Sequence, residues 1–166
     1  GDLDQAIEAY RRVLEIAPED RAALNNLANI YRQLERFDEA RKLLLRAVQQ
    51  SGGAVVPLSN LIELYLDQNQ LDSARAWLAR LETLNPRSAH VLAYRIRLQY
   101  SAGDLAAAAA AARRMADAPD APAEARPIAL WALAMVEYTR GRHRAGAAAV
   151  ADRVRALEAA GGPGAG

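Results

Sequence analysis

The chain has 166 residues, 52% of them apolar, which is enough for one packed core. Its 21 Lys and Arg residues balance its 20 Asp and Glu residues, and the resulting net charge of +1 produces no long-range field that would favour nucleic acid or an anionic membrane. The absence of cysteine excludes disulfides, thiolate zinc sites and a cysteine nucleophile.

Hydrophobic runs are short throughout. The longest, residues 105–112 and 127–136, fall below the roughly 18 residues that a membrane helix needs, so we expect no membrane insertion. A cysteine-free chain fits the cytoplasm, which we expect, and the periplasm as the alternative. The bias toward alanine and arginine suggests a bacterium of high GC content.

The apolar pattern has the period of α-helices from the first residues onward. Leu3, Ile7, Tyr10 and Leu14 lie at helical spacing, and Ala17-Pro18 stops this run. Glycine and proline interrupt the later runs in the same way, and no strand pattern occurs. We therefore expect nine helices, over about residues 3–16, 21–34, 37–50, 54–68, 71–84, 88–102, 105–117, 123–139 and 144–160.

A longer period, of about 34 residues, also runs through the chain. Ala6, Ala40, Ala74 and Ala108 follow one another at this fixed step, and Tyr31 and Tyr65 keep it too. A shared period at small, apolar and helix-stopping positions indicates internal duplication. Two more rows have the same step: Pro18, Gly52 and Pro86 at helix ends, and Leu3, Phe37, Leu71 and Leu105 at helix starts.

Local signals refine the helix boundaries. Pro57 falls in the first turn of its helix, where a missing amide hydrogen costs little, and Ser88 is a suitable N-cap. The step from Gly103 to Gly141 exceeds the repeat period by four positions, which indicates an insertion, and we place it in the proline-rich stretch 117–127.

These residues resemble the tetratricopeptide repeat, a 34-residue helix-turn-helix written W-x2-L-G-x2-Y…A-x3-F…P. The resemblance covers about residues 1–117, and beyond them it is looser. In the copy after Ser88 the usual residues are replaced by Arg95, Ile96 and Gln99. The two best copies read Leu24, Leu27, Ala28, Tyr31, Ala40, Leu44, Gly52 and Leu58, Leu61, Ile62, Tyr65, Ala74, Leu78, Pro86.

The resemblance implies an all-α, right-handed solenoid of about four and a half repeats and nine helices. We expect one domain over residues 1–160 and a flexible tail over 161–166. The chain opens at a second helix, so it is expected to be a piece of something longer, with the apolar face of residues 3–16 uncovered. The expected parts are a half repeat 1–18, repeats 21–52, 54–86 and 88–119, and a divergent repeat 123–160.

Catalytic and metal-binding patterns are absent. His90 and His143 fall in different repeats and lack any ligand spacing. No nucleophile elbow or phosphate-binding glycine loop is present, and the carboxylates alternate with arginines as in ordinary surface pairing. We expect no catalytic residue, no metal site and no cofactor, and therefore no enzyme.

In the repeats that this chain resembles, first helices face a concave groove, so residues one repeat apart form rows along it. Met135 and Tyr138 extend two of these rows when the insertion is allowed for, and Asp67 adds to their mixed charge. The predicted peptide-binding groove consists of three rows: Asn26, Asn60 and Tyr94; Asn29, Glu63 and Arg97; Arg32 and Tyr100, with Leu66 between them.

Two kinds of groove chemistry are known in the family. Asn26 and Asn60 look like the start of the asparagine ladder of O-linked N-acetylglucosamine transferases, in which amides bind a peptide backbone; solvated surface amides are the alternative. The carboxylate clamp that holds the C-terminus of cytosolic heat-shock chaperones is rejected. Asn29 and Asn60 fill its asparagine slots, but its basic slots hold Asn25, His90 and Tyr94.

The sequence therefore predicts a non-catalytic scaffold for a peptide or protein ligand. One alternative is a regulatory or substrate-recruiting segment of a larger enzyme, such as a glycosyltransferase, or of a bacterial polysaccharide-export machine. Another is self-assembly into a homo-oligomer through the exposed face of residues 3–16. A catalytic domain after residue 166 in the parent gene would favour the first alternative.

Overall fold

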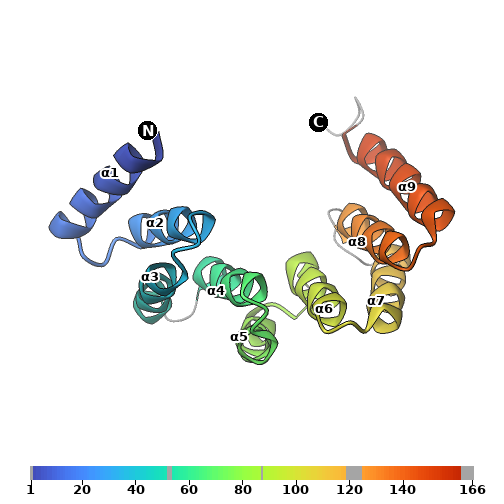
Figure 1. Ribbon diagram of the computed structural model, residues 1–166, viewed down its shortest axis with the longest axis horizontal. Helices are drawn as coiled ribbons and strands as arrows, with labels where there is room; N and C mark the ends of the chain where they lie inside the picture. The colour runs from blue at the N-terminus through green and yellow to red at the C-terminus, as the bar shows by residue number, and fades with distance from the viewer. Residues whose placement is uncertain (1, 52–53, 87, 119–124, 162–166) are drawn as a thin grey trace. The chain divides into compact units, whose positions relative to one another are not determined.

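The structure is a computed structural model that describes residues 2–51, 54–86, 88–118 and 125–161. In these ranges all regular structure is helical, without strands (Figure 1). The expected fold class is confirmed, and every predicted helix starts and ends within two residues of an observed one. The helices are α1 (Asp2–Ile16), α2 (Arg21–Gln33), α3 (Phe37–Gln50), α4 (Val55–Asp67), α5 (Leu71–Leu84), α6 (Ala89–Ser101), α7 (Leu105–Asp117), α8 (Ala125–Thr139) and α9 (His143–Gly161).

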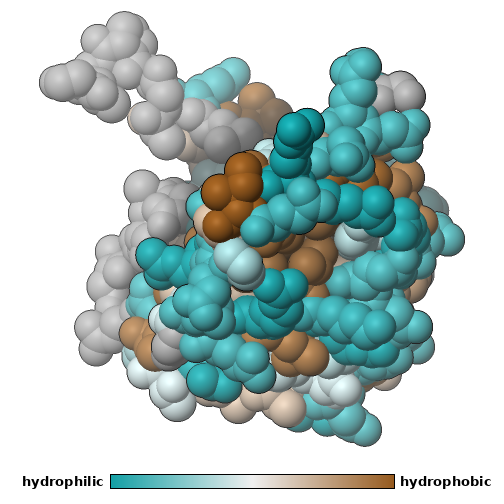
Figure 2. Space-filling view, turned by 90° about the vertical axis from the view of Figure 1, so that its left-hand side faces the viewer, coloured by the Kyte–Doolittle hydropathy of each residue, from teal (hydrophilic) through white to brown (hydrophobic). Residues whose placement is uncertain are grey.

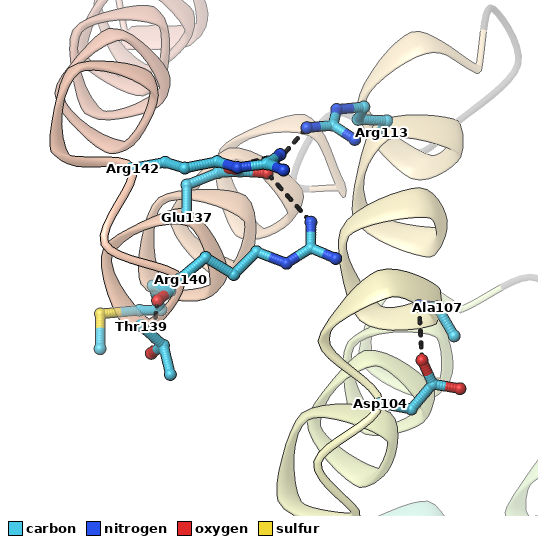
Figure 3. Close-up of polar contacts among 8 residues, drawn as sticks. Asp104, Ala107, Arg113, Glu137, Thr139, Arg140 and Arg142 are labelled. Atoms are coloured by element: carbon cyan, nitrogen blue, oxygen red, sulfur yellow. Dashed lines mark hydrogen bonds and ion pairs between the residues drawn. The ribbon is translucent and has the colours of Figure 1, made fainter.

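Short polar side chains cap several helix starts. The predicted cap Ser88 accepts a hydrogen bond at Oγ from the backbone N–H of His90 at 3.2 Å. Asp20 and Asp104 accept in the same way from amides three positions later, at 2.7 and 2.9 Å, and Figure 3 shows the second of these caps. Each cap satisfies an amide that the helix itself leaves unpaired. The predicted tail 162–166 and the middle of the proline-rich connection lie outside the described residues.

The turn inside each repeat has one residue of left-handed backbone. In successive repeats this residue is Glu35 (φ 57°), Asn69 (φ 54°), Gly103 (φ 80°) and Gly141 (φ 72°). The amide that follows each of them donates to a carbonyl five positions back, at 2.8 to 2.9 Å. Gly103 and Gly141 thus occupy equivalent turns, in agreement with an insertion between them.

The chain forms two compact units, residues 1–84 and 85–166. In the first unit, α2 and α4 pack against each other, α3 packs against both, α1 contacts α2, and α5 contacts α4. Its core is leucine-rich: Leu24, Leu44, Leu58 and Leu61 have no exposed surface. The single solenoid expected over residues 1–160 stays a prediction.

In the second unit, α6 packs against α7 and α8, α7 against α8, and α8 against α9. Small side chains dominate this core, because most residues of α7 are alanine and alanine buries little area per residue. Each helix of the described ranges is too short or too polar to span a bilayer. The core consists of Ala89, Ile96, Ala108, Ala109, Ala112, Met115, Ala125, Ala129 and Val136.

Replacing Gly103 by alanine should lower the free energy of unfolding of the second unit by about 1 kcal/mol. A Cβ atom at this position would meet nothing within 4 Å, so the cost comes from its φ of +80°. Urea unfolding followed by Trp131 fluorescence, in a Trp77→Phe background, measures the effect. Asn69→Gly, which relieves the same conformation in the first unit, is the opposite control and is followed by Trp77 fluorescence in a Trp131→Phe background. Equal stability of the alanine and glycine forms at residue 103 would contradict the prediction.

Candidate functional site

Polar side chains of the first unit join α1, α2 and α4. Asn60 donates through Nδ2 to Oδ1 of Asn25 at 3.1 Å, and Asn25, which is buried, donates to the carbonyl of Arg21 at 2.7 Å. Asn26 is exposed and donates to the Tyr10 hydroxyl at 3.2 Å. The predicted row of Asn26 and Asn60 is therefore not linked directly, because Asn60 bonds to the neighbouring Asn25.

Arg32 connects α2 to α4. Its Nη2 lies 3.2 Å from Oε2 of Glu63, and its Nη1 lies 2.5 Å from Oδ2 of Asp67. The repeat register puts Arg32 and Glu63 in separate rows, and the structure brings them together. The three side chains remain 23 to 33% exposed, so solvent screens this network and it contributes modestly to stability.

Two polar atoms on this side of α2 are buried without a hydrogen-bond partner in the described part of the chain. One is the acceptor Oδ1 of Asn29, and the other is the donor Nε of Arg32. They belong to residues three positions apart, which are neighbours on a helix. Unpaired buried groups are rare in folded proteins. Both atoms are buried, so a ligand would reach them only after a change of side-chain rotamer.

The predicted residues of the second unit lie in different environments. Tyr94 is buried, with 8% of its surface exposed, whereas Arg97 is exposed. The Tyr100 hydroxyl is 2.9 Å from Oγ1 of Thr139, which donates to the carbonyl of Met135, so Tyr100 links α6 to α8.

An apolar row stands exposed on α8. Trp131 is 51% exposed, Met135 41% and Tyr138 40%, and their spacing of four and three positions places them on one side of the helix. The repeat register predicts Met135 and Tyr138 as extensions of two rows but assigns Trp131 no role. The indole alone gives no sign of its exposure, because a tryptophan in an apolar helix is usually part of the core.

Among the described residues of the second unit, Glu137 is the charged side chain that is buried, with 1% exposure (Figure 3). Its Oε1 accepts from Nη2 of Arg113 at 2.8 Å and lies 3.6 Å from Nη1 of Arg140. Nη1 of Arg142 lies 3.6 Å from Oε2, which is buried without a hydrogen-bond partner among the described residues. Three guanidinium groups, one from α7 and two from the turn between α8 and α9, thus surround one carboxylate.

This cluster was not predicted, although the repeat register contains its signal. After correction for the four-residue insertion, Glu137 is equivalent to Tyr31 of the first unit. Arg113 and Arg142 are likewise equivalent to Arg11 and Arg36 of that unit. In the first unit Arg11 donates to the Tyr31 hydroxyl at 3.1 Å, and the Arg36 guanidinium lies 4.4 Å from the centre of the Tyr31 ring. A carboxylate has replaced an aromatic ring between two equivalent arginines.

No group of three or more His, Asp or Glu residues in the described ranges is arranged to hold a metal ion. Comparison with known proteins then settles the family. Two models of the tetratricopeptide repeat match residues 1–53 and 60–124, which together make up more than half of the chain. The chain belongs to the tetratricopeptide-repeat family.

No curated protein matches this tetratricopeptide-repeat chain. Among solved structures, a thermophilic tetratricopeptide-repeat protein of Thermus thermophilus is 22% identical, with a TM-score of 0.74 over 92% of this chain and 82% of that one. MamA of Desulfovibrio magneticus RS-1 is 11% identical, with a TM-score of 0.67 over 96% and 88%. YrrB, described as having an unusual peptide-binding site, is 15% identical, with a TM-score of 0.58 over 93% and 78%. These likenesses concern the fold.

Proposed function

We propose that this tetratricopeptide-repeat chain is a non-catalytic scaffold that binds a peptide or protein segment on the exposed side of its first helices. The exposed row of Trp131, Met135 and Tyr138 carries the proposal. Tryptophan and tyrosine dominate the energetics of protein interfaces, and exposed apolar side chains at adjacent helical positions form a continuous contact surface.

The polar side chains of the first unit support the same function with different chemistry. Asn26 remains exposed, and a rotation of the Asn29 side chain would present its buried, unpaired Oδ1 to a ligand. An amide both donates and accepts, so such groups bind an extended backbone independently of its side chains. The proposed ligand-contacting residues are Asn26, Asn29, Arg32, Asn60 and Glu63 in the first unit and Tyr94, Arg97, Tyr100, Trp131, Met135 and Tyr138 in the second.

Replacing Trp131 by alanine should weaken binding of the partner by roughly 2 kcal/mol, about 30-fold in Kd. The partner is first captured from the source cell with the wild-type chain, purified, and then titrated by calorimetry. Circular dichroism verifies that each variant is folded. The triple variant Asn26→Ala/Asn60→Ala/Arg97→Ala tests the polar residues in the same titration.

The matched control is Val150→Ala on α9, because Val150 is 40% exposed but belongs to a second helix. It should leave Kd unchanged. A partner that binds the wild type, Trp131→Ala and the triple variant equally would show that recognition lies on another surface, and it would contradict the proposal.

Self-assembly is the second candidate, and the exposure of α1 favours it. Leu3 is 45% exposed, Val13 39% and Ile16 83%. Figure 2, which faces this side of the molecule, shows hydrophobic surface among hydrophilic residues. A second copy could cover these residues. Sedimentation velocity at increasing protein concentration tests this candidate. A monomer mass that stays constant up to high concentration, with Ile16→Asp behaving as the wild type, would reject it.

A further inference from the structure

An open surface pocket of about 430 Å³, here termed the cavity, lies between α1, α2 and α3, within the first unit. Its volume is in the range of sites that bind small molecules or single large side chains. None of its residues belongs to the proposed ligand-contacting set on α2 and α4. The lining residues are Arg11, Leu14, Glu15, Leu27, Tyr31, Glu39, Lys42, Leu43 and Arg46.

The cavity has an apolar interior and a charged rim. Leu14, Leu27 and Leu43 come from three different helices and supply the apolar surface. Hydrogen bonds hold two of the rim arginines: Arg11 donates to the Tyr31 hydroxyl at 3.1 Å, and Arg46 donates to the carbonyl of Pro18 at 2.7 Å. The rim is therefore positioned by the fold.

The rim has more positive than negative charge available to a ligand. Glu39 accepts from Nε and Nη2 of Arg36, at 2.9 and 2.5 Å. This hydrogen bond lowers the pKa of Glu39 below its ordinary value, and Lys42 adds a smaller effect in the same direction. Arg36 lies outside the cavity lining and neutralises Glu39. Of the charged residues that remain in the lining, Glu15 is negative, and it is outnumbered by the cations Arg11, Lys42 and Arg46.

The next repeat shows which side chain suits the position of Leu43 in the cavity wall. One repeat after Leu43 stands Trp77, and one repeat after Arg46 stands Arg80. Trp77 is half-buried, and the Arg80 guanidinium lies 5.8 Å from the centre of its ring, a cation–π contact. The chain thus places an indole beside an arginine where the preceding repeat has a leucine, an arginine and a cavity.

The geometry points to a second binding site, in which this cavity receives a tryptophan side chain from an acidic segment of a protein partner. The indole fills the apolar space between Leu14, Leu27 and Leu43, as a large aromatic side chain does in a well-formed interface pocket. Arg46 stacks on the ring as Arg80 does on Trp77, and Lys42 attracts carboxylates that flank the tryptophan. The site uses the second helices α1 and α3, so it extends beyond the proposed scaffold surface.

The test uses the full chain and a capped peptide, Glu-Asp-Trp-Asp-Glu, with the same peptide carrying alanine in place of tryptophan as its control. Titration is followed by the amide resonances of ¹⁵N-labelled protein. We expect saturable shifts at residues of α1 and α3 with the tryptophan peptide and none with the alanine peptide. Absence of saturable shifts in the cavity residues at millimolar peptide would overturn the site.

Leu43→Trp fills the cavity with the residue that the next repeat uses, and it should weaken peptide binding at least tenfold while the thermal unfolding temperature is maintained. Trp77→Leu should open an equivalent cavity and produce additional shifts in α5. Lys42→Glu, at an exposed position that does not disturb the core, should weaken binding about threefold at low salt. Binding that is unchanged in both Leu43→Trp and Lys42→Glu would contradict the proposal.

Trp131→Ala separates this site from the scaffold surface. It should remove any peptide contact with the exposed row of α8 but leave the peptide-induced shifts in α1 and α3 unchanged. If Trp131→Ala removes the shifts and Leu43→Trp does not, the peptide binds on α8, and the cavity is not its site.

Discussion

Truncation of Leu44 to alanine should lower the free energy of unfolding of the first unit by about 3 kcal/mol. Leu44 has no exposed surface and lies in α3, which packs against both α2 and α4. Removing its three outer carbon atoms forfeits their burial and leaves a cavity that the neighbouring helices fill only in part. Urea unfolding monitored by Trp77 fluorescence, in a Trp131→Phe background, isolates this unit.

The repeat supplies a matched control at Tyr10, which stands one repeat before Leu44. Tyr10 is half-buried because no helix in the described chain covers the corresponding face of α1. Tyr10→Ala should therefore cost only about 1 kcal/mol. Similar losses for the two variants would mean that the α1 face is covered in solution, and a dependence of the Tyr10→Ala effect on protein concentration would identify a second copy as the cover.

Glu137→Ala should destabilise the second unit by about 2 kcal/mol. The substitution removes a carboxylate that contacts Arg113 at 2.8 Å and lies within 3.6 Å of Arg140 and Arg142, and it leaves a void between α7 and α8. The free energy of unfolding falls by no more than this because the side chains of Arg113 and Arg142 are more than half exposed and are hydrated once the carboxylate is removed. Trp131 fluorescence in a Trp77→Phe background reports the unfolding of this unit.

Glu137→Tyr should be neutral or stabilising, in contrast to the alanine variant. The first unit holds Tyr31 between Arg11 and Arg36 at the equivalent place, so the repeat geometry accommodates an aromatic ring. Replacement of buried ion pairs by well-packed apolar groups is often neutral or favourable, because the charges no longer need to be desolvated. Arg155→Ala, which breaks an exposed pair with Asp152, is the control and should change stability by less than about 0.5 kcal/mol. A tyrosine variant as unstable as the alanine variant would contradict the equivalence of the two positions.

The helices and their turns can be located from the sequence with little error, because the signals for them are local. Pro57 marks the first turn of α4, Ser88 caps α6, and Gly103 forms the turn between α6 and α7. Each feature depends on the backbone conformation of a few adjacent residues. Repetition of such features at a constant period then indicates the family, which the family models confirm.

Side-chain roles depend on the neighbouring helices and could not be read in the same way. Tyr94 and Trp131 are both aromatic residues of first helices, yet the former is 8% and the latter 51% exposed. Asn60 bonds to Asn25 and not to Asn26, since a shift of one residue moves an amide by about 100° around the helix. The peptide-binding residues therefore stay a prediction.

The sequence by itself determined the helical repeat, its period and the presence of an insertion between Gly103 and Gly141, because helix boundaries follow from short-range backbone preferences that recur in each copy. Only the tertiary structure decided which polar groups meet and which apolar groups remain outside. The approach of α7 to α8 surrounds Glu137 with arginines, and the space between α1 and α3 leaves a cavity beside Leu43. Both arise from contacts between residues far apart in the chain, whose distances no local pattern fixes.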